Sequence, residues 1–543
     1  MNQQIVYPFV DNLLSLIHRM QRMCPSSRAI LSMLVVSIAS IPLIFVIDSS
    51  LQLTFEKWLN LWNTRLFGLM WNTLSLATLV AIGSLILGVS TAWILVRREF
   101  FGRRIAMWLL ILPLTIPTYV FSYIYTNLLD DDGWLNLFWK FFFGENSIPP
   151  DLYNIFGVAY VLTLAGFSYV FLLVHDALTR TKQNLEEAAQ IQCASKWKIF
   201  FRINLPLLRP AIAASMAMVV LHVLSDFGAV STLRFQTFTL SIFNQMNGRF
   251  DYNAAAGLSL VLVSLSLSFL ILERFFRSRQ RYFSGSQSRT IKRKPVTKLE
   301  LIVIWCWLGG ISLFSFFLPL AWMINWSIES WSQGLINVEF WSYVGNSLSI
   351  SLMTAFAAVF LALPIALYHA RKRNLLSQTY IQLSSVGFVL PGPVIALGIL
   401  TFVLAWLEPL YGGMMALVFA MVIRFLPLAV QSQESAAQQI TPNLELAGRS
   451  LGAGSWENLW RVIIPSIRGG MFTAWVLVFI DTLKELPATI ILRPIGFDTL
   501  PVRIWIEASE EMLELAAPAA LLLVICTLPV LWFLLKPMQN LKR

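Results

Sequence analysis

The chain carries one polar stretch twice. Residues Asn184–Pro206 read NLEEAAQIQCASKWKIFFRINLP, and residues Asn443–Pro465 read NLELAGRSLGAGSWENLWRVIIP. The two stretches align without a gap at a constant offset of 259, and eight of their positions are identical. Each stretch lies between long apolar segments. The sequence therefore predicts a duplicated protein that has an equivalent polar loop in each half.

The composition is that of a membrane protein. Hydrophobic residues make up 57% of the 543 residues, whereas charged residues make up only 13%, about half the share that is usual in soluble domains. The apolar segments are continuous rather than alternating, which favours helices over a β-barrel. Because a span needs roughly 20 apolar residues, we expect an all-α polytopic membrane protein with about twelve transmembrane helices. The expected spans are 29–48, 70–96, 105–128, 154–179, 205–225, 254–273, 300–326, 344–370, 377–406, 412–432, 464–483 and 512–535.

The distribution of charge in the loops predicts the orientation. The segment 274–298 carries nine Lys or Arg residues and no acid, and four arginines lie in the loop that follows the second span. Loops rich in Lys and Arg stay in the cytoplasm, whereas the acidic loop 129–152 is expected outside. We therefore expect both termini and both repeated loops in the cytoplasm. The net charge of +11 follows from this asymmetry, so no nucleic-acid partner is expected.

Several classes of chemistry lack their motifs. The four cysteines include no CxxC pair, and the four histidines are scattered, so neither a zinc site nor a disulfide framework is expected. The chain contains no GxxxxGK[ST] motif with which to bind ATP. We therefore expect no enzymatic activity and no cofactor on this chain, with any ATP bound by a separate subunit.

The repeat also predicts the domain organisation. The first half covers residues 1–275, a basic cytoplasmic linker covers 276–299, and the second half covers 300–543. Weaker repeats support this division, because Asn72–Ser75 (NTLS) is similar to Asn346–Ser349 (NSLS), and Leu112-Pro113 is similar to Leu390-Pro391. Parallel repeats of this kind place a transport pathway at their interface.

The repeated loops have the composition of a compact helix–turn–helix. Small residues allow another backbone to approach closely, and acids near a helix start are favoured by the helix dipole. Such an element can dock into a cleft of a soluble partner. The alternative is an ordinary amphipathic loop, which the occurrence of two matched copies disfavours. The expected coupling residues are Glu186, Glu187, Ala188, Ala189 and Cys193 in the first loop (about 182–206), and Glu445, Leu446, Ala447, Gly448 and Gly452 in the second (about 441–465).

Both loops resemble the EAA loop of ABC importer permeases, in which EAA is followed after three residues by Gly and later by I-x-L-P. The first loop matches at Glu187-Ala188-Ala189 but has Cys193 in place of the glycine. The second has Leu446 in the position of the glutamate, with Glu445 one residue earlier, and matches at Gly452. These departures imply that the two docking points are unequal.

The resemblance extends to permeases of type I importers in which two halves are fused, and in particular to the ferric iron transport permeases. The segments Leu224–Val230 (LSDFGAV) and Lys484–Thr489 (KELPAT) are similar to signatures of that group. It implies a bacterial inner-membrane permease that works with two copies of an ABC ATPase and a periplasmic substrate-binding protein, and that moves ferric iron inward by ATP-driven alternating access. Thiamine or another small solute is an alternative cargo, and a twelve-helix secondary transporter is an alternative of another class.

Two acids are candidate pathway residues. Asp226 and Glu485 share the offset of 259 and follow the fifth and eleventh spans. Ionisable groups at membrane depth are costly and often functional, and carboxylates suit a hard cation, although no metal site as such is predicted. The alternative is that both acids cap helices. Four prolines, at positions 113, 117, 391 and 393, are expected to bend the third and ninth spans.

Overall fold

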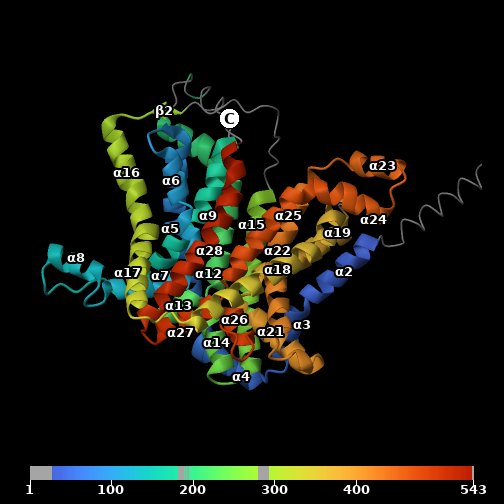
Figure 1. Ribbon diagram of the computed structural model, residues 1–543, viewed down its shortest axis with the longest axis horizontal. Coiled ribbons are helices and arrows are strands. Elements are labelled where there is room, and N and C mark those ends of the chain that lie inside the picture. Colours follow the sequence, from blue (N-terminus) through green and yellow to red (C-terminus); the bar gives the residue numbers. More distant parts are fainter. Residues whose placement is uncertain are drawn as a thin grey trace, which may run out of the picture. The chain divides into compact units, whose positions relative to one another are not determined.

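The computed structural model describes residues 27–180, 189, 191, 195–278, 293–372 and 374–540 (Figure 1). In the first half the helices are α2 (Ser27–Ala39), α3 (Ile41–Leu51), α4 (Phe55–Leu61), η1 (Trp62–Leu66), α5 (Phe67–Arg97), α6 (Arg103–Leu109), η2 (Leu112–Thr115), α7 (Thr118–Leu129), α8 (Trp134–Phe143), α9 (Ile155–Arg180), α11 (Lys196–Ile199), η3 (Phe200–Asn204), α12 (Leu205–Ser225), α13 (Gly228–Thr232), α14 (Phe238–Asn247) and α15 (Tyr252–Ser278).

The second half continues with α16 (Lys298–Ser312), η4 (Leu313–Phe317), α17 (Leu318–Ser332), α18 (Val338–Arg371), α19 (Leu375–Ser384), α20 (Val386–Val389), α21 (Gly392–Trp406), η5 (Glu408–Leu410), α22 (Met414–Gln438), α23 (Pro442–Ser450), α24 (Ser455–Asn458), η6 (Leu459–Ile463), α25 (Ile464–Leu483), α26 (Pro487–Leu492), α27 (Leu500–Ser509) and α28 (Leu513–Asn540). Two strands of two residues each, β1 (Arg98–Glu99) and β2 (Lys294–Pro295), pair in parallel.

The all-α polytopic fold is confirmed. Among the described residues, nine helices are long and apolar enough to cross a membrane, and two pairs of bent helices could each form one further span. The shorter apolar helix α21 lies in the ninth predicted segment. Within the described residues, eleven of the twelve predicted segments thus coincide with an apolar helix or a bent pair, whereas in the ninth, 377–406, only α21 is an apolar helix.

The predicted proline bend is present in the third span, and in the ninth a new helix starts after a proline. The third span breaks by 96° between Thr115 and Thr118, and Pro117 is the N-cap residue of α7. In the ninth span Pro391 is likewise the N-cap residue of α21. A proline has no N–H to donate to the preceding turn and disfavours helical geometry in the residue before it, so the helix ends ahead of each proline and a new one starts after it.

Two compact units are present, and their boundaries differ from those of the sequence halves. The smaller unit comprises the described residues up to Ile41 together with Leu352–Gly387 and Met421–Phe479. The larger unit comprises Pro42–Ser351, Phe388–Ala420 and the described residues from Ile480 onward.

The offset of 259 is repeated in the secondary structure. It relates α11 to α24 and the π-helical turn η3 to η6, residue for residue. The first residues of α12 and α25 are also 259 positions apart. A π-helical turn adds one residue to a helical turn and is rare. Its occurrence at matched positions therefore supports the interpretation of the sequence as a duplication.

Earlier segments of the two halves are related by an offset of 274. This offset relates η2 to α20 and the start of α7 to that of α21. The predicted match of Leu112-Pro113 with Leu390-Pro391 is therefore wrong by four residues, because the dipeptides align at 278. The structural counterpart of Pro391 is Pro117, since each precedes the first residue of its helix.

The similar segments NTLS and NSLS make equivalent hydrogen bonds within the larger unit. The Asn72 side chain donates to the carbonyl of Gln236 at 3.1 Å, and the Asn346 side chain donates to that of Asp498 at 3.0 Å. The hydroxyl of the next residue accepts from the first N–H group of a short helix in each half. Thr73 accepts from Phe238 of α14 at 3.4 Å, and Ser347 accepts from Leu500 of α27 at 2.7 Å. In both halves the second span thus holds the start of the helix that precedes the last span.

The helices α5, α9 and α12 pack against one another in the core of the larger unit (Figure 1). A Cβ atom at Gly88 of α5 would lie 2.6 Å from Cβ of Val170 on α9. Small residues at such points let helix backbones approach closely, which is how membrane helices gain packing energy.

The end of the predicted linker is attached to the segment between α5 and α6. Strand β2 pairs with β1, Arg293 lies 3.4 Å from Glu99, and Arg98 lies 3.3 Å from Glu300. The linker residues 279–292 lie outside the described residues.

Candidate coupling loops and pathway residues

The second repeated loop is a helix–turn–helix, as predicted. Helix α23 ends in a turn in which Gly452 N–H donates to Arg449 and Ala453 N–H donates to Gly448, and α24 follows. Gly452 has a φ of +87°, in the left-handed region that ends helices and favours glycine. The glycine of the motif is thus needed for the turn itself.

Gly448 serves packing inside the loop. A Cβ atom at this position would lie 2.6 Å from Oδ1 of Asn458 on α24. The Asn458 amide in turn donates to the carbonyl of Glu445 at 2.9 Å. The small residue therefore lets α24 pack against α23, and the segment that approaches Gly448 closely is part of the loop itself.

The outer surface of this loop includes exposed apolar side chains. The side chains of Leu446, Leu451 and Trp456 are exposed, and Leu451 is 88% exposed. Ala447 is exposed as well. Exposed apolar side chains grouped on a polar loop are typical of a protein-binding surface.

Glu445 is the anchor of the loop. It is buried, and its carboxylate lies 3.2 Å from Nη1 of Arg28 on α2 and 3.5 Å from Nε of Arg371 at the end of α18. Arg371 also donates to the carbonyl of Ile440 at 2.9 Å. The glutamate thus fixes α23 to its own chain, a role that spacing in the sequence did not reveal.

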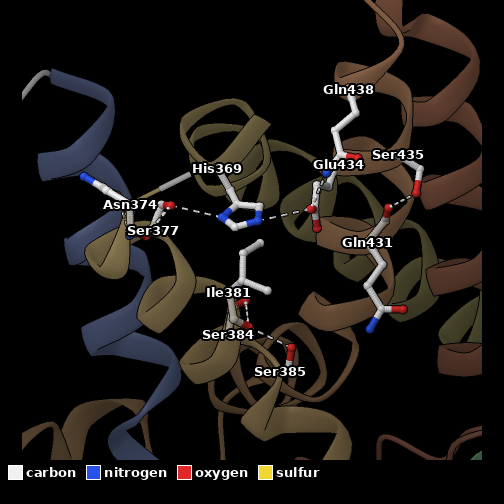
Figure 2. A network of polar contacts seen from close by, with 10 residues as sticks. All are labelled: His369, Asn374, Ser377, Ile381, Ser384, Ser385, Gln431, Glu434, Ser435 and Gln438. Atoms are coloured by element: carbon white, nitrogen blue, oxygen red, sulfur yellow. Dashed lines mark hydrogen bonds and ion pairs between the residues drawn. The ribbon is translucent and has the colours of Figure 1, made fainter. Parts of the chain in front are cut away.

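Polar contacts also fix the helix that leads into this loop. Figure 2 shows His369 of α18 between two partners, with its Nδ1 3.1 Å from the Ser377 hydroxyl and its Nε2 3.5 Å from Glu434 of α22. Deeper in the unit, the buried Gln433 side chain donates to the carbonyl of Val359 at 2.8 Å. Because α18 and α22 are held together in this way, a displacement of α23 would be passed to both helices.

The first loop is described only in part. Glu186, Glu187, Ala188 and Cys193 lie outside the described residues. Ala189 is helical and partly exposed, and α11 and η3 follow.

The candidate pathway residue Asp226 caps a helix. It is buried, and Oδ1 accepts from the N–H groups of Ala229 and Val230 at 3.0 and 3.4 Å, in the first turn of α13. Its Oδ2 accepts from the Thr118 hydroxyl of α7 at 2.5 Å. The carboxylate therefore satisfies donors that a helix start leaves unpaired.

Glu485 makes the equivalent arrangement in the second half. Its Oε1 accepts from Ala488 N–H at 3.0 Å, and its Oε2 accepts from the N–H and the hydroxyl of Thr489, each at 3.1 Å. Glu485 is also buried. The structure thus realises the helix-capping alternative at both positions, and contact with a passing cation remains a prediction.

A third buried carboxylate lies on α27. Glu507 is paired with Arg503 at 2.7 Å, and burial raises the pKa of Glu507 although the guanidinium opposes that rise. Neither Glu507 nor the buried Tyr119 and Tyr123 of α7 stands out in the sequence as a candidate site residue. Within the described residues, no group of three or more His, Cys, Asp or Glu side chains is placed to hold a metal ion.

The model of the binding-protein-dependent transport system inner membrane component matches the chain twice, over residues 84–282 and 356–535. Each match contains one of the repeated loops. The Fe(3+)-transport system permease protein FbpB 2 of Haemophilus influenzae is 30% identical over 91% of this chain and 95% of its own length.

Two further relatives show the range of similarity. The ferric transport system permease protein FbpB of Actinobacillus pleuropneumoniae is 26% identical over 78% of this chain and 64% of its own length. The sulfate transport system permease protein CysT of Escherichia coli is 28% identical over 42% of this chain and 84% of its own length. The double match excludes the alternative of a secondary transporter: the chain belongs to the inner membrane components of binding-protein-dependent transport systems, and it is a two-half permease of an ABC importer.

Proposed function

We propose that this permease carries ferric iron from the periplasm to the cytoplasm. The observation that carries the proposal is the extent of the match. The relative that covers 91% of the chain has a name that specifies Fe(3+) transport, whereas the sulfate permease covers 42%. The match to the relative named for Fe(3+) transport thus extends over both halves of this chain.

The proposed complex contains two copies of an ABC ATPase and one periplasmic substrate-binding protein. One ATPase would dock on each repeated loop, and both termini would lie in the cytoplasm of a bacterium, beneath the inner membrane. The exposed Leu446, Leu451 and Trp456 support such docking at the second loop. The permease contributes no catalytic group, and ATP is bound by the partner.

Docking would be coupled to the membrane through the buried anchor. When the ATPases close on ATP, α23 would move, and the ion pairs of Glu445 with Arg28 and Arg371 would pass the motion to α2 and α18. Helix α18 is 34 residues long, which is about 50 Å at 1.5 Å per residue. It is therefore long enough to carry a displacement across a bilayer, as alternating access requires.

The test is uptake of radiolabelled ferric iron by cells with and without this chain, with the ATPase intact and then inactivated. Uptake that requires both proteins is the expected result. If iron uptake is unaffected by the chain while the ATPase still co-purifies with it, ferric iron is not the cargo, and thiamine is the next substrate to supply. A chain that co-purifies with no ATPase would contradict the docking role of the loops.

A further inference from the structure

Helix α7 lies against the short helices that follow the fifth and eleventh spans. It packs on α13 and on α27 in the larger unit. Its Thr118 donates to the Asp226 carboxylate, and a Cβ atom at Gly228 would lie 2.8 Å from Cβ of Tyr119. Side chains on this face of α7 are therefore enclosed beside the candidate pathway acids.

Two tyrosine hydroxyls on α7 are buried without a partner. Tyr119 and Tyr123 are each 3% exposed, and neither hydroxyl has a hydrogen-bond partner among the described residues. By contrast, the hydroxyl of Tyr125 on the same helix donates to the carbonyl of Phe314. An unpaired buried hydroxyl costs about 1–3 kcal/mol, so its presence calls for an explanation.

The two hydroxyls lie on one side of the helix. Residues four apart are about one turn apart on the same face, roughly 6 Å along the axis. The Glu485 carboxylate lies within electrostatic reach of Tyr119, and the Glu507 carboxylate lies within reach of Tyr123. One buried carboxylate thus lies near each hydroxyl, and that of Glu507 is paired with Arg503.

The neighbouring carboxylates already have partners. Glu485 accepts from the first turn of α26, and Glu507 is paired with Arg503. The tyrosine hydroxyls are different, because they are buried oxygen atoms for which no protein donor or acceptor is present within the described residues. They are therefore the oxygens best placed to serve a transient ligand.

The fold does not require tyrosines here. At the offset of 274 the counterparts of Tyr119 and Tyr123 are Pro393 and Leu397 of α21, and both of these are buried. Helix α21 packs on α26 as α7 packs on α13. The same scaffold is therefore built once with apolar side chains and once with phenols.

We propose that Tyr119 and Tyr123 are two successive oxygen ligands for the ferric ion during its passage, with the carboxylates of Glu485 and Glu507 nearby. This inference rests on the proposed function and adds to it the ligands that the carboxylates alone do not supply. Hard cations prefer oxygen donors. When a phenol oxygen bonds to the ion, its O–H bond breaks and the proton passes to water; reprotonation releases the ion to the next oxygen. A conduction path needs such weak, successive sites.

The first experiment compares Tyr119→Phe, Tyr123→Phe and the double variant in the complex with its ATPase and binding protein, by uptake of radiolabelled ferric iron. We expect the double variant to lose uptake by on the order of tenfold, the scale of losses when groups around a metal are removed. Tyr153→Phe is the matched control, because Tyr153 is 57% exposed and should leave uptake unchanged. Since neither buried hydroxyl makes a hydrogen bond, the thermal stability and the amount of ATPase that co-purifies should not fall.

A spectroscopic measurement tests the ligands on the unmutated chain. The complex is held with ATP by an ATPase variant that does not hydrolyse it, and ferric citrate is added. A visible phenolate-to-iron charge-transfer band is expected, which the Tyr119→Phe/Tyr123→Phe variant should lack. Absence of the band, or wild-type uptake by the double variant, would overturn the inference and leave the iron permease standing. If the unmutated complex takes up no ferric iron, both the proposed function and this inference fail.

Discussion

The two halves share a backbone plan but differ in the side chains that face its centre. In the first half α7 follows Pro117 and packs on α13, which Asp226 caps; in the second α21 follows Pro391 and packs on α26, which Glu485 caps. Yet α7 presents hydroxyls where α21 presents apolar side chains. Duplication thus preserved what the fold needs, and the polar face of α7 is the part that the fold alone does not explain.

The largest effect is expected in the coupling loops, the other pair of equivalent segments. Gly452→Glu places a charged side chain on a backbone of φ +87°, where a residue with a Cβ atom costs about 1–2 kcal/mol. No atom lies within 4 Å of a Cβ built at this position, so the charge would project toward the docking partner. We expect iron uptake to be lost while ATP hydrolysis continues, measured as iron imported per ATP.

The matched change in the first half is Cys193→Gly, since Cys193 stands 259 residues before Gly452. We expect uptake close to that of the wild type, because glycine fits the position in the motif. Loss of uptake in Cys193→Gly, or fully coupled uptake in Gly452→Glu, would show that the two loops are not equivalent.

A second comparison concerns the contact between the short helix and its neighbour. Gly228→Ala should lower stability by about 1–3 kcal/mol, because the added methyl group would lie 2.8 Å from Cβ of Tyr119. The counterpart of Gly228 in the second half is Pro487, which already carries a Cβ atom. Pro487→Ala therefore adds no atom at this position and should cost less. Thermal unfolding of the purified complex measures both. If both variants lost the same stability, the close approach of Gly228 to Tyr119 would not be a feature of the first half alone.

Alanine at either capping carboxylate should cost about 1–2 kcal/mol. Asp226→Ala and Glu485→Ala each remove the acceptor of two backbone N–H groups, so thermal unfolding should show similar losses for the two halves. A clear difference between them would weaken the structural equivalence of α13 and α26.

The amide variants separate capping from contact with the cation. Asp226→Asn keeps one oxygen for both N–H groups of α13, whereas Glu485→Gln keeps an oxygen for only one of the two N–H groups of α26 and should therefore lose some stability. Both variants remove the negative charge. We expect several-fold slower iron uptake from each, since a carboxylate attracts a trivalent cation more strongly than an amide does. Wild-type uptake by both amide variants would mean that the acids are helix caps and nothing more.

Much of the fold could be predicted because it follows from local composition. Apolar length located the spans, and Pro117 and Pro391 marked the breaks, since proline acts on its own helix. The predicted alignment of Leu112-Pro113 with Leu390-Pro391 was wrong because it relied on two identical dipeptides. The starts of α7 and α21 show that the offset is 274.

Contacts between distant residues could not be predicted from the pattern. The partners of Glu445 are Arg28 and Arg371. Even Arg371, the nearer of the two in the sequence, precedes Glu445 by 74 positions. A buried ion pair of this kind leaves no periodic signal. Tyr119 and Tyr123 lie inside a predicted span, where the sequence does not distinguish a lipid-facing phenol from an enclosed one, and only the structure shows that they are enclosed.

The smallest expected effect tests whether equivalent contacts have equal strength. The Ser347 hydroxyl accepts from Leu500 N–H at 2.7 Å, whereas the Thr73 hydroxyl accepts from Phe238 N–H at 3.4 Å. A hydrogen bond of the first length contributes about 1 kcal/mol, and one of the second contributes less. Ser347→Ala should therefore lower the unfolding free energy more than Thr73→Val, which removes the hydroxyl and keeps the shape of the side chain. Thermal unfolding of the two variants in the same complex decides the order, and a larger loss from Thr73→Val would mean that the first half holds its helix start the more firmly.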